Sequence, residues 1–291
     1  VVGDELVEVD KSYSVVLESP SHATLDKGVG TGTIVENDTA TVSIAKSGDA
    51  AEEGLDAGEF TVTLTKLVES AVVVNYNVGG TATGGTDYTN LSGSVTIPAK
   101  TSTAQIGVTP QQDDMVEGTE TVEVTLSGTD NSRVTVDTLP SNQTASVSIT
   151  DNDNAVVGVT ATVNTTEEGS LSAGQYTITM TKEAQSAVIV YYDVTGSATP
   201  GSDYTSLGSS VTIPAGSKSV TVDVASIQDE IVEGSEDVTL TLSGTNNANV
   251  TVDPVEEYQS ATVSITDDDE AEISIEATQA NAAENGEGDP T

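Results

Sequence analysis

The chain has 291 residues, of which 47 are acidic and eight are basic, so its net charge is −39. A surface of this charge repels nucleic acid and anionic membranes and attracts divalent cations. The sequence contains no cysteine and no apolar run long enough to cross a membrane, which excludes disulfides, thiolate metal sites and a membrane span in this sequence.

Apolar and polar residues alternate along most of the chain, as in residues 60–64, 122–126 and 261–265. A period of two is typical of half-buried strands. This alternation, with 35% hydrophobic residues, favours an ordered chain over the disorder that high charge can cause. About seven short strands per repeat, separated by Gly, Asn, Asp and Pro turns, predict all-β, tandem immunoglobulin-like antiparallel β-sandwiches arranged end to end.

Long stretches of the sequence occur twice, 116 positions apart. The matching pairs are 80–88 with 196–204, 112–120 with 228–236, and 151–153 with 267–269. A repeat of this length is a whole domain rather than a solenoid unit. The chain is therefore expected to be a piece of a tandem array.

The repeats divide the chain into four segments. Residues 4–8 match 113–117, so the first segment corresponds to the last third of a repeat. In chain order we expect the C-terminal part of a preceding repeat at 1–38, complete domains at 39–153 and 154–269, and the first strand or strands of a following repeat at 270–291. On this interpretation the natural protein is longer in both directions, and neighbouring domains follow one another with almost no linker.

Each complete repeat carries acidic residues in four separate stretches that a sandwich could bring to one pole. In the first repeat these are Glu52 and Glu53, then Asp87, then Asp113, Asp114, Glu117 and Glu120, and finally Asp151 and Asp153. Calcium binds six to eight oxygen ligands, often from carboxylates. About nine carboxylates at one pole would repel one another without cations. A solvated acidic loop is the alternative, but recurrence at equal spacing in two copies favours calcium.

The combination of residues 80–88, 113–120 and 148–153 resembles the Calx-β domain, a family that includes the calcium sensors of sodium–calcium exchangers, integrin β4 and many large bacterial surface proteins. The resemblance covers essentially all of residues 39–269 and implies several Ca²⁺ ions per complete domain. In the first domain it implies as ligands Glu53, Asp87, Asp113, Glu117, Glu120, Asp151 and Asp153, with Asp114 as a further candidate and a backbone carbonyl from Met115. In the second it implies Glu168, Asp203, Asp229, Glu233, Glu236, Asp267, Asp268 and Asp269, with Glu230 as a further candidate and a carbonyl from Ile231. The choices between Glu52 and Glu53 and between Glu167 and Glu168 stay open.

The sequence departs from the family pattern at several positions. Gln112 and Gln228 stand where the exchanger sensors carry another Asp, which should cost or weaken one ion. Asn152 replaces the middle Asp of the first triplet. Lys11 stands where the complete repeats have Glu120 and Glu236, so the leading segment is expected to bind calcium weakly or not at all.

Catalytic interpretations are weaker. Paired carboxylates could serve a glycosidase, but the chain has no Trp and one Phe to line a sugar cleft. The single His22 has no counterpart in the complete repeats, and no nucleophile elbow or phosphate loop is present. Tyr88 and Tyr204 are more typical of core residues than of ligand platforms, and the alternating Thr residues of an ordinary strand face give little support to ice binding. We therefore expect a protein that is not an enzyme.

The favoured function is a calcium-binding structural module of a long extracellular bacterial surface protein, such as an adhesin stalk or filament. Its expected partners are calcium and neighbouring repeats, with self-assembly into a fibre as an open possibility. Because Asp151 and Asp153 lie only a few residues before Val157, bound calcium would stiffen the joint between domains. A regulatory calcium-sensor pair and a ligand-binding adhesive module are the alternatives.

Overall fold

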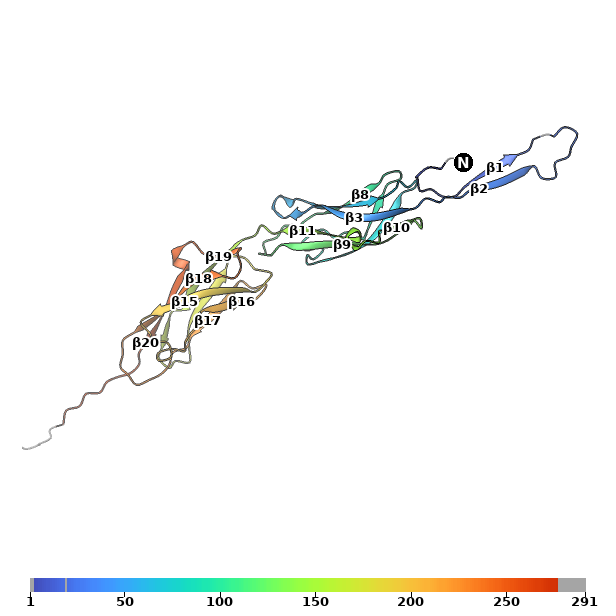
Figure 1. The fold of residues 1–291 in the computed structure, drawn as a ribbon. Coiled ribbons are helices and arrows are strands. Elements are labelled where there is room, and N and C mark those ends of the chain that lie inside the picture. Colours follow the sequence, from blue (N-terminus) through green and yellow to red (C-terminus); the bar gives the residue numbers. More distant parts are fainter. Residues whose placement is uncertain (1–2, 19, 277–291) are drawn as a thin grey trace, which may run out of the picture. The chain divides into compact units, whose positions relative to one another are not determined.

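The computed structural model describes residues 3–18 and 20–276 (Figure 1). It divides into two compact units, the first ending at Asn154 and the second beginning at Ala155. The first unit holds a leading hairpin and one β-sandwich, and the second holds another β-sandwich. No helix among the described residues is long and apolar enough to cross a membrane.

The leading hairpin consists of β1 (Lys11–Val16) and β2 (Val29–Ile34), which pair antiparallel. All side chains of β1 are exposed. The hairpin forms a two-stranded sheet of its own.

The first sandwich is made of two sheets. Its strands are β3 (Ala40–Gly48), β4 (Ala50–Ala51), β5 (Gly58–Leu64), β6 (Val72–Gly80), β7 (Ser94–Ile97), β8 (Thr103–Val108), β9 (Glu120–Thr129), β10 (Val134–Val136) and β11 (Thr144–Thr150). One sheet has the order β10-β3-β5-β8 and the other β4-β11-β9-β6-β7. Short helical turns occur at η1 (Glu53–Leu55) and α1 (Pro140–Gln143).

The second sandwich repeats this topology. Its strands are β12 (Ala155–Val163), β13 (Thr165–Glu167), β14 (Gly174–Met180), β15 (Val188–Gly196), β16 (Ser210–Ile213), β17 (Ser219–Val224), β18 (Glu236–Thr245), β19 (Val250–Val252) and β20 (Ser260–Thr266), with a turn at η2 (Glu256–Tyr258). The sheet orders are β17-β14-β12-β19 and β13-β20-β18-β15-β16.

The core of each sandwich follows from the period-two pattern. Phe60, Val62 and Leu64 alternate inward along β5 and are buried, as are Tyr176 and Ile178 on β14. Tyr176 replaces the phenylalanine of the first copy, and its hydroxyl donates a hydrogen bond to the Val238 carbonyl, so the added polar atom is satisfied. The prediction of an all-β, immunoglobulin-like fold is confirmed.

The structure differs from the sequence-based expectation in strand count and direction. In the described residues 40–150 nine strands form instead of about seven, because β4 and β10 are only two and three residues long and leave no readable pattern. Two pairings, β3 with β10 and β4 with β11, are parallel. The chain passes from one sheet to the other between β3 and β4, which brings the next acidic residues beside the end of β11.

The start of a following repeat at 270–291 stays a prediction. Residues 271–276 lie outside any strand, and Ile273 and Ile275 are exposed. A strand needs a partner for its backbone ladder, and none pairs with these residues in the described part of the chain. Residues 277–291 lie outside the described residues.

Candidate metal centre

Two groups of three carboxylates form at one pole of the first sandwich. Glu52, Asp151 and Asp153 each offer an oxygen within 4.8 Å of the others. Asp87, Glu117 and Glu120 do the same. We call these the terminal cluster and the central cluster. All four acidic stretches that the sequence singled out therefore contribute to one end of the fold.

Strand pairing positions the terminal cluster. The two-residue strand β4 runs parallel to the end of β11, with Ala51 beside Thr150. The Glu52 amide then donates to the Thr150 carbonyl at 3.1 Å. Because Glu52 directly follows β4 and Asp151 directly follows β11, this short parallel pairing brings their side chains together.

A glycine-dependent turn positions the central cluster. Gly80 ends β6 with φ of 111°, and a Cβ there would lie 2.1 Å from the Thr121 carbonyl oxygen. Only glycine permits this approach of β6 to the start of β9, where Glu120 lies. Beyond it, the Asp87 carboxylate accepts a hydrogen bond from the Thr83 amide at 2.5 Å, which fixes a buried acid beside Glu120.

Asp151 links the two clusters. Its carboxylate accepts the amide of Asp153 at 2.7 Å and the amide of Glu117 at 2.6 Å. Asp113 accepts the Met115 amide at 2.7 Å. The charge of Asp113 also acts on both Glu52 and Glu117. The two clusters are therefore neighbouring parts of one acidic site.

The crowding of acids is costly without a cation. Burial, followed by the charge of Asp151, raises the pKa of Glu52 to about 7. Burial, followed by the charge of Asp87, raises the pKa of Glu117 to about 8. Oε2 of Glu52 is buried and has no hydrogen-bond partner, which is expensive for a carboxylate oxygen. An oxygen-only set of this kind fits a hard divalent cation such as Ca²⁺.

The second sandwich has the same two clusters. Glu168, Asp267 and Asp269 form the terminal cluster, and Asp203, Glu233 and Glu236 form the central one. The linking aspartate is again the first of the triplet, because Asp267 accepts the amides of Glu233 at 2.6 Å and Asp269 at 2.8 Å.

The second site, like the first, has a buried carboxylate oxygen without a partner and a carboxyl group with a raised pKa. Oδ2 of Asp269 is buried without a hydrogen-bond partner. A hydrogen bond with Asp203, followed by burial, raises the pKa of Glu236 to about 7. The Asp229 amide donates to Glu168 at 2.9 Å. The second site is therefore suited to the same kind of ion.

Other candidate ligands lie outside the clusters. Asp113 and Asp229 lie close enough for their charges to act on both clusters of their domain. Six other candidate ligands outside the clusters have exposed side chains, namely Glu53, Asp114, Glu167, Glu230, Asp268 and Ile231. In the first pair of alternatives the structure places Glu52 in the cluster rather than Glu53, and in the second Glu168 rather than Glu167. Carbonyl ligation by Met115 and Ile231 stays a prediction.

A glutamine contact was not anticipated from the sequence. The Gln112 side-chain amide donates to Oδ1 of Asn152 at 3.0 Å, and Gln228 donates to Oδ1 of Asp268 at 3.2 Å. The glutamine that replaces an expected ligand thus ties the central loop to the terminal triplet. Its recurrence 116 positions later was the available signal.

These features define a class of acidic, tandem β-sandwich domains suited to calcium. The family model of the Calx-beta domain matches residues 35–153 and 150–269. The chain belongs to the Calx-beta family, a non-catalytic family whose domains bind calcium, and the resemblance noted in the sequence is confirmed.

Several solved structures are similar to this chain. CBD12 from CALX1.2 has 16% identity and a TM-score of 0.34, over 77% of this chain and 99% of that chain. Calcium binding domain CBD12 of CALX1.1 has 19% identity and a TM-score of 0.33, over 74% and 83%. The apo form of the Calx CBD1 domain has 20% identity and a TM-score of 0.33, over 40% and 100%. No curated protein matches the chain in sequence.

Proposed function

We propose that this chain is a calcium-stiffened structural part of a long extracellular bacterial surface protein. Each complete domain binds several Ca²⁺ ions at its acidic pole, and the ions stiffen the domain and the short connection that follows it. The partners are calcium and neighbouring repeats of the same protein.

One observation carries the proposal. The two complete domains hold the same pair of carboxylate clusters at equivalent positions, each with a buried carboxylate oxygen that no protein group satisfies. Clusters built from equivalent residues in both domains support a repeated mechanical unit, whereas a regulatory pair gains from two specialised sites. The net charge of −39 and the lack of cysteine support calcium, rather than disulfides, as the stabilising cross-link in an extracellular setting.

Calorimetric titration of the whole chain with Ca²⁺, and with Mg²⁺ for comparison, tests this function. Extracellular structural modules bind calcium with Kd of about 10⁻⁴–10⁻³ M, whereas sensors bind at about 10⁻⁷–10⁻⁵ M. We expect several ions per chain, weaker Mg²⁺ binding and affinities in the first range. Affinities in the second range in both domains would favour a regulatory sensor. No calcium binding, with an unfolding midpoint unchanged by EDTA, would contradict both functions.

A further inference from the structure

The leading segment is joined to the first sandwich by backbone and apolar contacts. Val7 is fully buried within the sandwich core, where it pairs with Val68 in a parallel bridge. The Val7 amide donates to the Leu67 carbonyl at 2.9 Å, and the Glu69 amide donates to the Val7 carbonyl at 2.9 Å. The loop between β5 and β6 thus receives residues 6–8 as an added strand-like segment.

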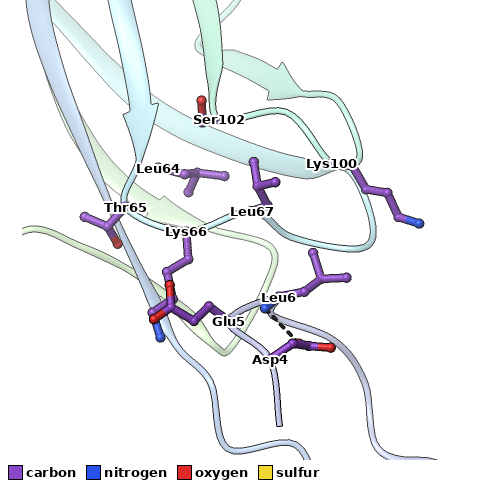
Figure 2. Close-up of a pocket in the computed structure, with 9 residues that line it drawn as sticks. All are labelled: Asp4, Glu5, Leu6, Leu64, Thr65, Lys66, Leu67, Lys100 and Ser102. Atoms are coloured by element: carbon purple, nitrogen blue, oxygen red, sulfur yellow. Dashed lines mark hydrogen bonds between the residues drawn. The ribbon is translucent and has the colours of Figure 1, made fainter. Parts of the chain in front are cut away.

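Figure 2 shows the two sides of this joint facing each other. Leu6 and Leu67 line a cavity of about 570 Å³, with Leu64, Lys66 and Lys100 also on the sandwich side. Asp4 and Glu5 of the leading segment line the same cavity as Lys66 and Lys100 of the sandwich. An apolar contact surrounded by opposite charges is typical of a specific interface.

The docked segment has the internal structure of the acidic loops in the complete domains. The Leu6 amide donates to Asp4, as Met115 donates to Asp113. In the same way, the carboxylate of Glu36 accepts the amides of Glu8 and Asp38, which is the arrangement that Asp151 makes with Glu117 and Asp153. The leading segment therefore presents an acidic pole of the same design to the next domain.

Protein cations, however, contact this acidic pole. Nζ of Lys66 lies 2.7 Å from Oδ1 of Asp38, and the hydrogen bond with Asp38, followed by the charges of Asp38, Glu5 and Glu36, raises the pKa of Lys66. Nη2 of Arg133 lies 2.9 Å from Oδ1 of Asp10, while its Nη1 donates to the Glu36 carbonyl. The first sandwich thus contributes Lys66 and Arg133 as ion-pair partners of acids in the leading segment.

A further lysine belongs to the leading segment itself. Nζ of Lys11 lies 2.5 Å from Oε1 of Glu8 and 3.6 Å from Glu69. Lys11 and Glu8 are equivalent to Glu120 and Glu117, which are both acidic in the central cluster. One substitution thus turns a repelling pair of acids into an ion pair.

We propose that residues 65–69 with Lys100 and Arg133 form a docking surface for the acidic loop of a preceding Calx-beta repeat, and that Lys66, Arg133 and Lys11 hold this joint closed without calcium. The occupant is the segment 4–10 with 36–38. This inference does not rest on calcium binding by the complete domains. Lys182 recurs 116 positions after Lys66, so the second domain carries the same lysine on its β14–β15 loop.

Amide hydrogen exchange of the whole chain, detected by NMR, tests the proposal at Val7 and Glu69. We expect both amides to be protected equally in EDTA and in millimolar Ca²⁺. In EDTA, Lys66→Met should speed their exchange about fivefold, the upper end for a partly exposed ion pair, and Lys66→Arg should restore most of the protection. Lys46→Met is the matched control, because Lys46 pairs with Asp49 on the same sandwich away from the joint.

Amides of β9 and β11 report whether the variant sandwich has folded. If Lys66→Met unfolds the sandwich, the wild-type chain in EDTA provides the test instead. Because salt screens ion pairs, 1 M NaCl should speed exchange at Val7 and Glu69 and leave exchange in β9 unchanged. Protection that depends on calcium, or that neither Lys66→Met nor salt reduces, would overturn the proposal.

Discussion

The β1–β2 hairpin and the β9–β11 pair form the same ladder in two different settings. Lys11 pairs with Ile34 as Glu120 pairs with Ile149, and Val15 pairs with Gly30 as Val124 pairs with Ala145. Yet Val15 is 56% exposed, whereas Val124 is fully buried. The register of a strand pair is therefore local information, while burial requires the remaining strands of the sandwich.

The same contrast holds for the acidic residues. Glu117 and Glu120 meet Asp87 in the central cluster of the complete domain. In the leading segment Glu8 meets Lys11 instead. Acids that a protein cation neutralises need no metal, whereas acids that face one another do. Four predictions test this contrast between the leading segment and the complete domain.

The largest effect is expected from removing calcium. At free calcium of 100 times Kd, each site adds about 2.7 kcal/mol if the unfolded chain does not bind, so several sites should raise the unfolding midpoints of both sandwiches strongly. The joint between Val7 and the β5–β6 loop should be equally stable with and without calcium. Thermal unfolding in EDTA and in millimolar Ca²⁺, with amide exchange at Val7, measures both. Equal unfolding midpoints in the two conditions would contradict a stabilising role of calcium.

Neutralising the central loop should come next. Asp113→Asn and Glu117→Gln should each remove at least one ion from the first domain and leave the second domain's sites intact. The charge of Asp113 acts on both clusters, and Glu117 belongs to the central one. One lost site is worth about 2.7 kcal/mol at 100 times Kd. Calorimetric stoichiometry measures the loss. Glu8→Gln is the control, since Glu8 is the leading-segment equivalent of Glu117 and pairs with Lys11; wild-type stoichiometry in all variants would show that the loop is only solvated.

Shortening equivalent valines should show directly how differently the β1–β2 and β9–β11 pairs are packed. Val124→Ala should destabilise the first sandwich by about 2 kcal/mol, because it removes buried methyl groups and leaves a cavity. Val15→Ala, at the equivalent but exposed position, should cost about 0.5 kcal/mol or less. Urea unfolding followed through the amide signals of residues 40–150 compares them. Similar costs would mean that β1 is packed as tightly as β9.

The last expected effect is a pH dependence of the metal-free protein. The pKa of Glu52 is about 7 and that of Glu117 about 8, against 4.5 ordinarily. The folded state therefore holds protons that the unfolded chain has released, so stability in EDTA should fall as pH rises from about 5 to 8.

Thermal midpoints of the first sandwich across this range measure the effect. Glu52→Gln should flatten the decline in EDTA. The joint at Val7 should not respond, because the raised pKa values of Lys66 and Lys11 keep both ammonium groups charged throughout. A midpoint that rises from pH 5 to pH 8 in EDTA would contradict the assignment of buried, mutually repelling acids.

The repeat, the fold class and the four acidic stretches of each domain can all be inferred from the amino-acid sequence alone. Strand alternation predicts inward residues such as Val62 and Val124 because a strand's side chains alternate between faces. Recurrence 116 positions apart separated meaningful acids from ordinary surface charge. These are local or periodic signals, and they need no knowledge of which loops meet.

Which acids face one another depends on how distant segments of the chain pack together. Glu52 rather than Glu53 joins the terminal cluster because β4, too short to leave a pattern, pairs in parallel with the end of β11. The exposed position of Asp114 and the linking role of Asp151 likewise depend on contacts between distant segments. The ion pair between Lys66 of the β5–β6 loop and Asp38 could not be predicted from either local sequence. It depends on how the first sandwich and the leading segment pack against each other.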